Sequence, residues 1–231
     1  MGGSSRSGQA GAGANMRTRG STVGDRQAPL RTLYAERPQA ALTRKSARTT
    51  SAEIAATDPF HGEVEVGSGY GTSLRFGLDR HVGGLHDAPN PADLLCAALA
   101  ACQDGAIRMI ANLLGVELAE LEVEVTGEVD ARGCLGADRD VRVGFEALEC
   151  RVSLRAKQGT HPKRVKTVIA AAERFCVNLD TLRGGVEVAN TADPAQTTSA
   201  PSGDESRLRR GRDAWAVPTT WSDGTTSGSG T

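Results

Sequence analysis

The sequence has few aromatic side chains, almost no net charge and no regular framework of cysteines. Phe, Trp and Tyr make up 3% of its 231 residues, and 27 basic side chains nearly balance 28 acidic ones. Its five cysteines are odd in number and irregularly spaced, which argues against the disulfide framework of a small secreted domain. We therefore expect reduced thiols, of which two can form one redox-active pair.

The sequence also lacks the apolar runs that carry a chain into or across a membrane. Its N-terminal stretch has no continuous apolar segment of the secretory kind, and no segment is expected to approach the roughly 18 apolar residues of a membrane span. These absences predict a cytoplasmic protein. Neither a Cys-x-x-Cys nor a His-x-x-x-His pair occurs, and the glycine turns lack the spacing of phosphate loops, so we expect no metal and no bound cofactor.

Composition divides the chain into a structured middle and two polar ends. Residues 1–27 and 191–231 cannot bury enough apolar surface to offset their chain entropy, and both are predicted to be disordered. The basic cluster at 207–212 is interpreted as part of a solvated tail, and this interpretation argues against a nucleic-acid partner. Residues 28–42 are predicted to form a short helix or arm, and residues 43–190 one globular domain.

The longest apolar helical pattern runs from Asn90 to Leu114 and carries Cys102 at its centre. Asn90 suits the N-cap, Pro91 the first turn, and Gly115 the C-terminal stop. Steps of three and four residues predict a buried face made of Leu95, Leu99, Cys102, Ala106, Met109 or Ile110, and Leu113. Small residues cover the other side, so we expect a second copy of the chain to pack there in a homodimer.

The remaining segments alternate as strands do, with one further helix. Strands are predicted at 43–57, 117–130, 148–157 and 186–189, with a hairpin over 62–78. A helix capped by Thr160 is predicted to end at Phe175, followed by Cys176 and a turn through Asn178 and Asp180. Local hairpins without a repeated βαβ unit predict an α+β fold with antiparallel sheets.

Three motifs resemble the superfamily of OsmC and organic hydroperoxide resistance (Ohr) proteins. They are NPADLLCAALAAC at 90–102, LEVEVTGEVD with RGCLGADRD over 121–140, and AERFCVNLDTL at 172–182. The resemblance covers roughly residues 43–190. It implies a dimer in which antiparallel sheets wrap long central helices, with Cys102 as the attacking thiol and Cys176 as the resolving thiol of a hydroperoxide reductase. It also implies a dithiol reductant such as a lipoylated protein or thioredoxin.

The sequence departs from the active peroxidases of that family at three positions. One is Val177, which stands where a Pro often follows the second cysteine. Those enzymes have a Glu directly after the Asn-Pro of the helix start and an Arg in the first hairpin region. Here Ala92 takes the Glu position, and Asp93 lies one residue later, about 100° further around the helix. His61 and its two predecessors stand where the Arg is expected. A second hypothesis therefore stays open: a dimeric binding or stress protein without fast chemistry.

Hydroperoxide reduction by two cysteines requires a reactive thiolate and a second thiol close to it. A thiolate attacks the peroxide to become a sulfenic acid, and a second thiol condenses with it to a disulfide. Burial raises the pKa of a thiol, so Cys102 in an apolar pocket would need a cation or a hydrogen-bond donor. Each cysteine can also be a plain core residue, and this is the expectation for Cys96 and Cys150. Cys134 is expected in a loop.

Overall fold

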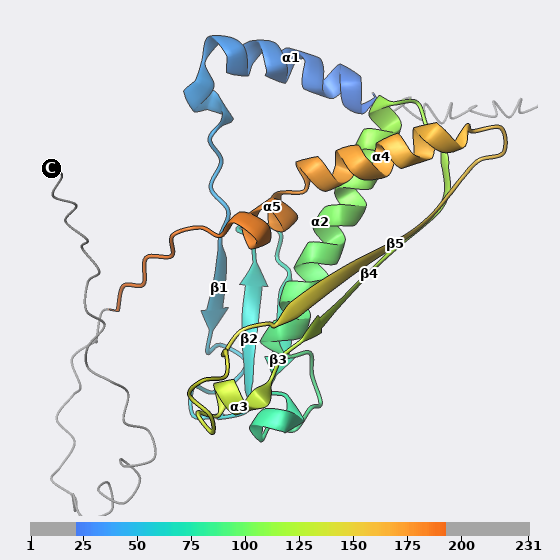
Figure 1. Cartoon of the computed structure of the whole chain (residues 1–231). Helices are drawn as coiled ribbons and strands as arrows, with labels where there is room; N and C mark the ends of the chain where they lie inside the picture. The colour runs from blue at the N-terminus through green and yellow to red at the C-terminus, as the bar shows by residue number, and fades with distance from the viewer. Residues whose placement is uncertain (1–21, 193–231) are drawn as a thin grey trace, which may run out of the picture. The chain divides into compact units, whose positions relative to one another are not determined.

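The computed structural model describes residues 22–192, and the predictions for residues 1–21 and 193–231 lie outside that range. Its helices are α1 (Val23–Glu36), α2 (Pro91–Leu113), α3 (Ala131–Cys134), α4 (Pro162–Phe175) and α5 (Val177–Gly184), with 3-10 turns η1 (Pro38–Ala41) and η2 (Arg80–Val82). Its strands are β1 (Ala47–Thr50), β2 (His61–Val66), β3 (Ser73–Gly77), β4 (Leu118–Glu128) and β5 (Ala147–Ala156) (Figure 1).

The chain divides into two units that are described separately. Among the described residues, one comprises 22–128 with 147–185, and the other 129–146 with 186–192. The first unit contains two antiparallel sheets, one in the order β1-β2-β3 and one of β4 with β5. The predicted α+β fold with antiparallel sheets is confirmed.

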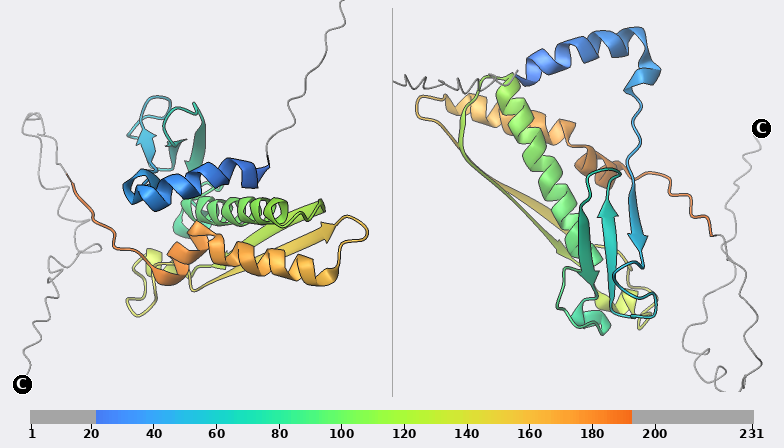
Figure 2. Two further views of the ribbon diagram at one scale, coloured as in Figure 1. Left: turned by 90° about the horizontal axis from the view of Figure 1, so that it is seen from above. Right: turned by 180° about the vertical axis from the view of Figure 1, so that it is seen from behind.

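Helix α2 is the centre of the first unit, as predicted. The Asn90 side chain accepts hydrogen bonds from the N–H groups of Ala92 and Asp93, and Gly115 ends the helical region in the left-handed conformation at φ 61°. The view from above shows α2 lying between α1 and α4 (Figure 2). Strands β4 and β5 run along it as a long ribbon, with Leu121, Val123, Val125, Val152 and Leu154 packed against the core.

The length and composition of α2 differ from one sequence expectation. Its 23 residues have a mean hydropathy of 1.5 over the most apolar window, which is enough to span a membrane by those two criteria. However, Leu99, Ile107 and Ile110 belong to the buried core formed with Val168 and Ala172 of α4. This packing is typical of the core helix of a globular domain.

The buried face of α2 is rotated from the predicted one. Leu99, Ala106 and Ile110 are buried as expected, but Leu95 remains 38% exposed. Residues outside the predicted face, Gln103, Ile107 and Ala111, are buried instead. The reason is that both α4 and β4 pack against α2, so the covered arc is wider than one stripe of apolar residues. A glutamine inside that arc could not be recognised from an apolar pattern.

The N-terminal arm begins earlier than the predicted boundary at residue 28. Helix α1 starts at Val23 because Thr22 and Asp25 form a capping box, each side chain pairing with the other's main-chain N–H. The Val23 N–H donates to Asn112 Oδ1 at 2.9 Å, and Gln27 Nε2 lies 3.2 Å from Met109 Sδ. These contacts dock α1 on the C-terminal part of α2, and the segment 22–27 is therefore helical rather than disordered.

Three predictions near the C-terminus of the domain are wrong. The turn expected through Asn178 and Asp180 is the helix α5, and its neighbour α4 is capped by His161 rather than by Thr160. The last strand at 186–189 does not form, since Val186 and Val188 are 66% and 80% exposed. A segment with alternating residues becomes a strand when another strand pairs with it, and none does so within residues 22–192.

Candidate thiol site

The structure brings the two predicted site cysteines together. Cys102 lies in the middle of α2 and is half-buried, whereas Cys176 is 0% exposed and forms the junction between α4 and α5. The main-chain N–H of Asn178, two residues after Cys176, donates to Cys102 Sγ at 3.5 Å. Helix α5 therefore begins against the turn of α2 that carries Cys102.

Burial and proximity change the acidity of the inner thiol. Burial raises the pKa of Cys176, and the neighbouring Cys102 thiol adds to the rise. The N–H groups of Leu179 and Asn178 oppose it, although neither makes a full hydrogen bond to the Cys176 side chain. Together with the contact from Asn178 to Cys102 Sγ, this effect on the pKa indicates that the two cysteines are neighbours, with Cys176 as the buried one.

Asn178 is a member of this site that the sequence did not indicate. Its side-chain Nδ2 donates to the carbonyl oxygen of Ala98 at 2.8 Å. In an α-helix that oxygen also accepts the N–H four residues later, which here belongs to Cys102. The sequence offered Asn178 as a turn former, because asparagine is common in turns. The contact with Ala98 depends on how α5 meets α2, for which no local signal exists.

The polar side chains nearest the expected Glu and Arg positions, Asp93 and His61, have other partners. Asp93 closes the capping box of α2 by accepting the main-chain N–H of Asn90 at 2.9 Å. His61 lies between two carboxylates, with Nδ1 3.0 Å from Asp58 Oδ2 and Nε2 2.9 Å from Asp87 Oδ1. Neither Asp93 nor His61 hydrogen-bonds the Cys102 sulfur.

The His61 contacts form a polar clamp between β2 and the loop that leads to α2. Hydrogen bonding to Asp87, followed by Asp58, raises the pKa of His61. The same contact lowers the pKa of Asp87, while the pKa of Asp58 is lowered first by the Phe60 N–H and then by His61. Within residues 22–192, no group of three His, Cys, Asp or Glu side chains is arranged to hold a metal ion.

The other three cysteines have separate surroundings. Burial raises the pKa of Cys96 and of Cys150, with smaller contributions from Asp93 and Glu173 respectively. Among the described residues, neither of these thiols hydrogen-bonds Cys102 or Cys176. In the second unit, Cys134 is exposed and its Sγ donates to the Val143 carbonyl oxygen at 3.3 Å. Cys134 lies in the short helix α3 rather than in the predicted loop.

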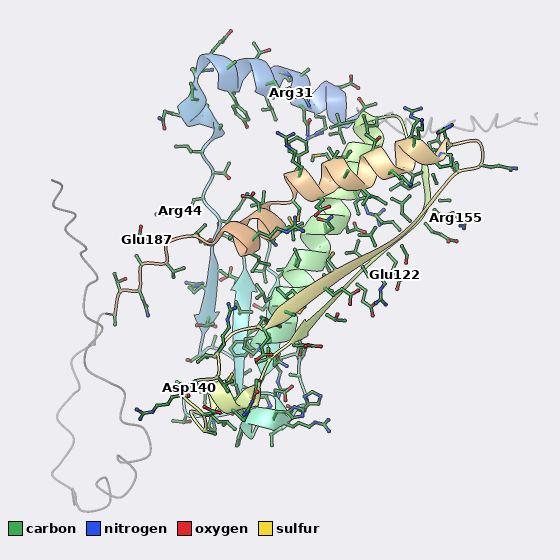
Figure 3. All side chains as sticks on the ribbon, in the orientation of Figure 1. Arg31, Arg44, Glu122, Asp140, Arg155 and Glu187 are labelled. Carbon is green, nitrogen blue, oxygen red and sulfur yellow. The ribbon has the colours of Figure 1, made fainter. Side chains whose placement is uncertain are left out.

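A surface hollow on the β4–β5 ribbon is distinct from the thiol site. Its lining residues are Glu120, Leu121, Glu122, Ser153, Leu154 and Arg155. The side chains of Glu122 and Arg155 lie on the side of the ribbon away from α2 (Figure 3). Arg155 pairs with Glu120 there, and both are more than 60% exposed. This hollow is a solvated, ion-paired surface and contains neither of the two site cysteines.

Comparison with known proteins gives a family match. Residues 84–190 match the family described as OsmC-like protein, a range that covers α2, β4, β5, α4 and α5 together with both site cysteines. The search of curated protein sequences gives no match.

Solved structures with a similar fold carry related names. The OsmC-like protein of Mycoplasma pneumoniae is 14% identical, with 62% of this chain and 89% of that chain covered and a TM-score of 0.48. An organic hydroperoxide resistance protein of Legionella pneumophila is 24% identical, with 62% and 92% covered and a TM-score of 0.41. OhrB of Bacillus subtilis is 20% identical, with 64% and 96% covered and a TM-score of 0.41.

The matched segment contains the thiol site and the elements that build it. On the strength of that match, residues 84–190 of this chain are similar to the OsmC-like protein family.

Proposed function

We propose that this protein reduces small organic hydroperoxides with Cys102 and Cys176. The Cys102 thiolate attacks one peroxide oxygen, so that an S–O bond forms, the O–O bond breaks, and the alkoxide leaves and takes up a proton. The Cys176 thiolate then attacks the sulfenic sulfur, forming the disulfide and releasing hydroxide, which is protonated to water. A dithiol reductant restores both thiols by supplying two electrons and two protons.

The observation that carries the proposal is the contact between α5 and Cys102. Asn178 donates to Cys102 Sγ, and the Cys102 thiol contributes to the raised pKa of Cys176, which is two residues from Asn178. Burial supports the order of the two roles. The half-buried Cys102 is open to a small substrate, whereas the fully buried Cys176 meets an oxidised Cys102 and no larger molecule.

A peroxide-consumption assay tests the proposal directly. Cumene hydroperoxide serves as the probe substrate and dithiothreitol as the probe reductant. Consumption should fall to the uncatalysed rate in Cys102→Ser, because no attacking thiol remains. The matched control is Cys150→Ser, which removes another half-buried thiol and should leave the rate unchanged. Equal rates for the wild-type protein and Cys102→Ser would refute the proposal.

Peptide mapping identifies the bond that forms. Trypsin cuts after Arg80, Arg108, Arg174 and Arg183, so Cys102 and Cys176 lie in different peptides. Treatment with one equivalent of cumene hydroperoxide should join those two peptides under non-reducing conditions. A bond from Cys102 to any other cysteine would contradict the assigned resolving thiol.

A binding or stress protein without fast chemistry is the second candidate. It is favoured by Ala92 at the expected Glu position and by the engagement of Asp93 and His61 with other groups. In that case the protein should bind an apolar ligand without consuming hydroperoxide, and Cys102 should stay reduced in the mapping experiment.

We further propose a homodimer that works in the reducing cytoplasm. Apolar side chains remain exposed around the thiol site, with Leu95 38%, Phe175 58% and Val177 71% exposed. A second copy would cover this surface. Light scattering at micromolar concentration should give twice the chain mass of 24.1 kDa. A monomer at that concentration would exclude the dimer.

A further inference from the structure

We propose that the first turn of α5 supplies the charge stabilisation of the thiol site, through the main-chain N–H and the side-chain amide of Asn178. In this inference, which rests on the proposed function, α5 takes the place of the absent Glu and Arg side chains. The feature is specific to this chain's residues: the donor, its anchor and both sulfurs lie within one turn of α2 and one turn of α5.

The donor is a group that the helix itself leaves unsatisfied. The N–H groups in the first turn of a helix have no partner within the helix, and they carry its positive partial charge. Cys176 is the N-cap of α5, and Asn178 follows as the second helical residue. Its N–H donates to Cys102 Sγ at 3.5 Å. A thiolate on Cys102 would satisfy that donor and gain from the helix terminus.

The side chain of Asn178 fixes the donor in place. Its Nδ2 donates to the Ala98 carbonyl oxygen at 2.8 Å, on the turn of α2 that precedes Cys102. One residue therefore holds the two helices together and directs an N–H at the sulfur. Without the amide, the start of α5 would be tied to α2 by the weaker N–H to sulfur contact and by the apolar packing of Cys176 and Leu179.

The same turn serves the second chemical step. The resolving step needs a negative charge on Cys176, which is buried and has a raised pKa. The N–H groups of Asn178 and Leu179 already lower that pKa in part. As the charge passes from Cys102 to Cys176, it stays beside the first turn of α5, so one element can assist both attacks.

The test is the pH dependence of Cys102 alkylation by iodoacetamide, followed by mass spectrometry. All proteins carry Cys96→Ala, because Cys96 and Cys102 share the tryptic peptide between Arg80 and Arg108. Asn178→Pro removes both donors, and proline is tolerated in the first turn of a helix. Val177→Pro is the matched control, since it adds a proline to the same turn and leaves both Asn178 donors in place.

We expect the alkylation profile of Asn178→Pro to move up by about one pH unit, which is roughly a tenfold loss of reactivity at neutral pH. The control should keep the parent profile. Asn178→Ala keeps the N–H but loses the anchor, and should lose about threefold. Identical profiles for Asn178→Pro and Val177→Pro would overturn the inference. If circular dichroism shows that Asn178→Pro is unfolded, an unchanged profile for Asn178→Ala overturns it instead.

Failure of the proposed function gives a different result. In that case the alkylation profiles of the Asn178 variants would differ from the parent profile as expected. Hydroperoxide would still form no bond between Cys102 and Cys176. Conversely, peroxide-driven bond formation with identical alkylation profiles would retain the proposed function and remove the role of α5.

Discussion

The helical region and the three-stranded sheet are held together by different forces. The buried apolar residues belong to α2, α4, the segment just before β4 and the Cys176 junction, and none belongs to β1, β2 or β3. In the sheet, Val66 and Leu74 are 43% and 42% exposed. The sheet instead depends on its strand pairing and on the clamp of His61 with Asp58 and Asp87. Apolar packing thus fixes the thiols, and polar contacts fix the sheet.

This difference predicts how each region responds to change. Apolar burial is insensitive to pH and sensitive to lost volume, whereas a carboxylate–imidazole clamp responds to the charge of its members. Four changes separate the two responses, and the largest effect is expected in the helical core.

Ile107→Ala should destabilise the whole domain by about 2–5 kcal/mol, because it empties a fully buried position of α2. Urea unfolding followed by circular dichroism measures the loss. Leu74→Ala in β3 is the control, and should cost about 1 kcal/mol or less because that side chain is 42% exposed. Equal losses at the two positions would mean that the sheet is packed as tightly as the helices.

Gly62→Ala should cost about 1–3 kcal/mol, felt mainly in the β2–β3 hairpin. Gly62 pairs with Phe76 across the hairpin, and an added Cβ would lie 2.3 Å from the Phe76 ring. Hydrogen exchange of the hairpin amides reports the effect. Gly105→Ala in α2 is the matched control, since an added Cβ there meets nothing within 4 Å. If the hairpin amides of Gly62→Ala stay as protected from exchange as in the wild-type protein, the Phe76 ring moves aside at little cost.

The clamp should loosen as the pH rises through the raised pKa of His61. The charged imidazole contributes stability in full below the ordinary value of 6.5, and this contribution is lost above the folded pKa. Asp58 and Asp87 have lowered pKa values, so their contribution is present above 3.8 and is lost in acid. The clamp is therefore strongest between those two values.

Above the folded-state pKa of His61, amide exchange should become faster in β2 and β3 and stay constant in α2. The rates are measured by NMR and corrected for the intrinsic pH dependence of exchange. His61→Gln should abolish the change in the sheet. An equal quickening in α2 would show that the two regions are coupled rather than separate.

Asn112→Ala should have the smallest effect, about 0.5–1.5 kcal/mol, because it removes one acceptor for the Val23 N–H. Limited proteolysis should release α1 sooner while the core stays intact. Arg26→Ala provides the control, because that side chain of α1 is exposed and makes no hydrogen bond among the described residues. An unchanged cleavage rate for Asn112→Ala would mean that other contacts dock the arm.

The sequence predicted best where a local rule decides the outcome. The ends of α2 follow from Asn90, Pro91 and Gly115, and the strands β4 and β5 follow from strict alternation. Cys102 and Cys176 were located through their motifs, and Asn178, two residues after Cys176, contacts the Cys102 sulfur. The catalytic roles of the two cysteines stay predictions.

The errors occurred where the outcome depends on a distant partner. Alternation alone predicted a strand at 186–189, which has no partner among the described residues. Gln103 is buried although glutamine is usually exposed, because packing around α2 covers a wide arc. The role of Asn178 depends on two contacts with residues 76 and 80 positions earlier in the chain. No short-range pattern encodes contacts over such a separation.

In the proposed reaction cycle, the unequal exposure of the two cysteines also determines the route by which the reductant returns electrons. In a disulfide between Cys102 and Cys176, the Cys176 sulfur lies behind the protein surface, with 0% of that residue exposed. An external dithiol must touch a sulfur to open the bond. The dithiol therefore attacks the Cys102 sulfur, and Cys176 is the leaving thiolate. The reductant needs a narrow reactive tip, and a mixed disulfide trapped during turnover should be found on Cys102.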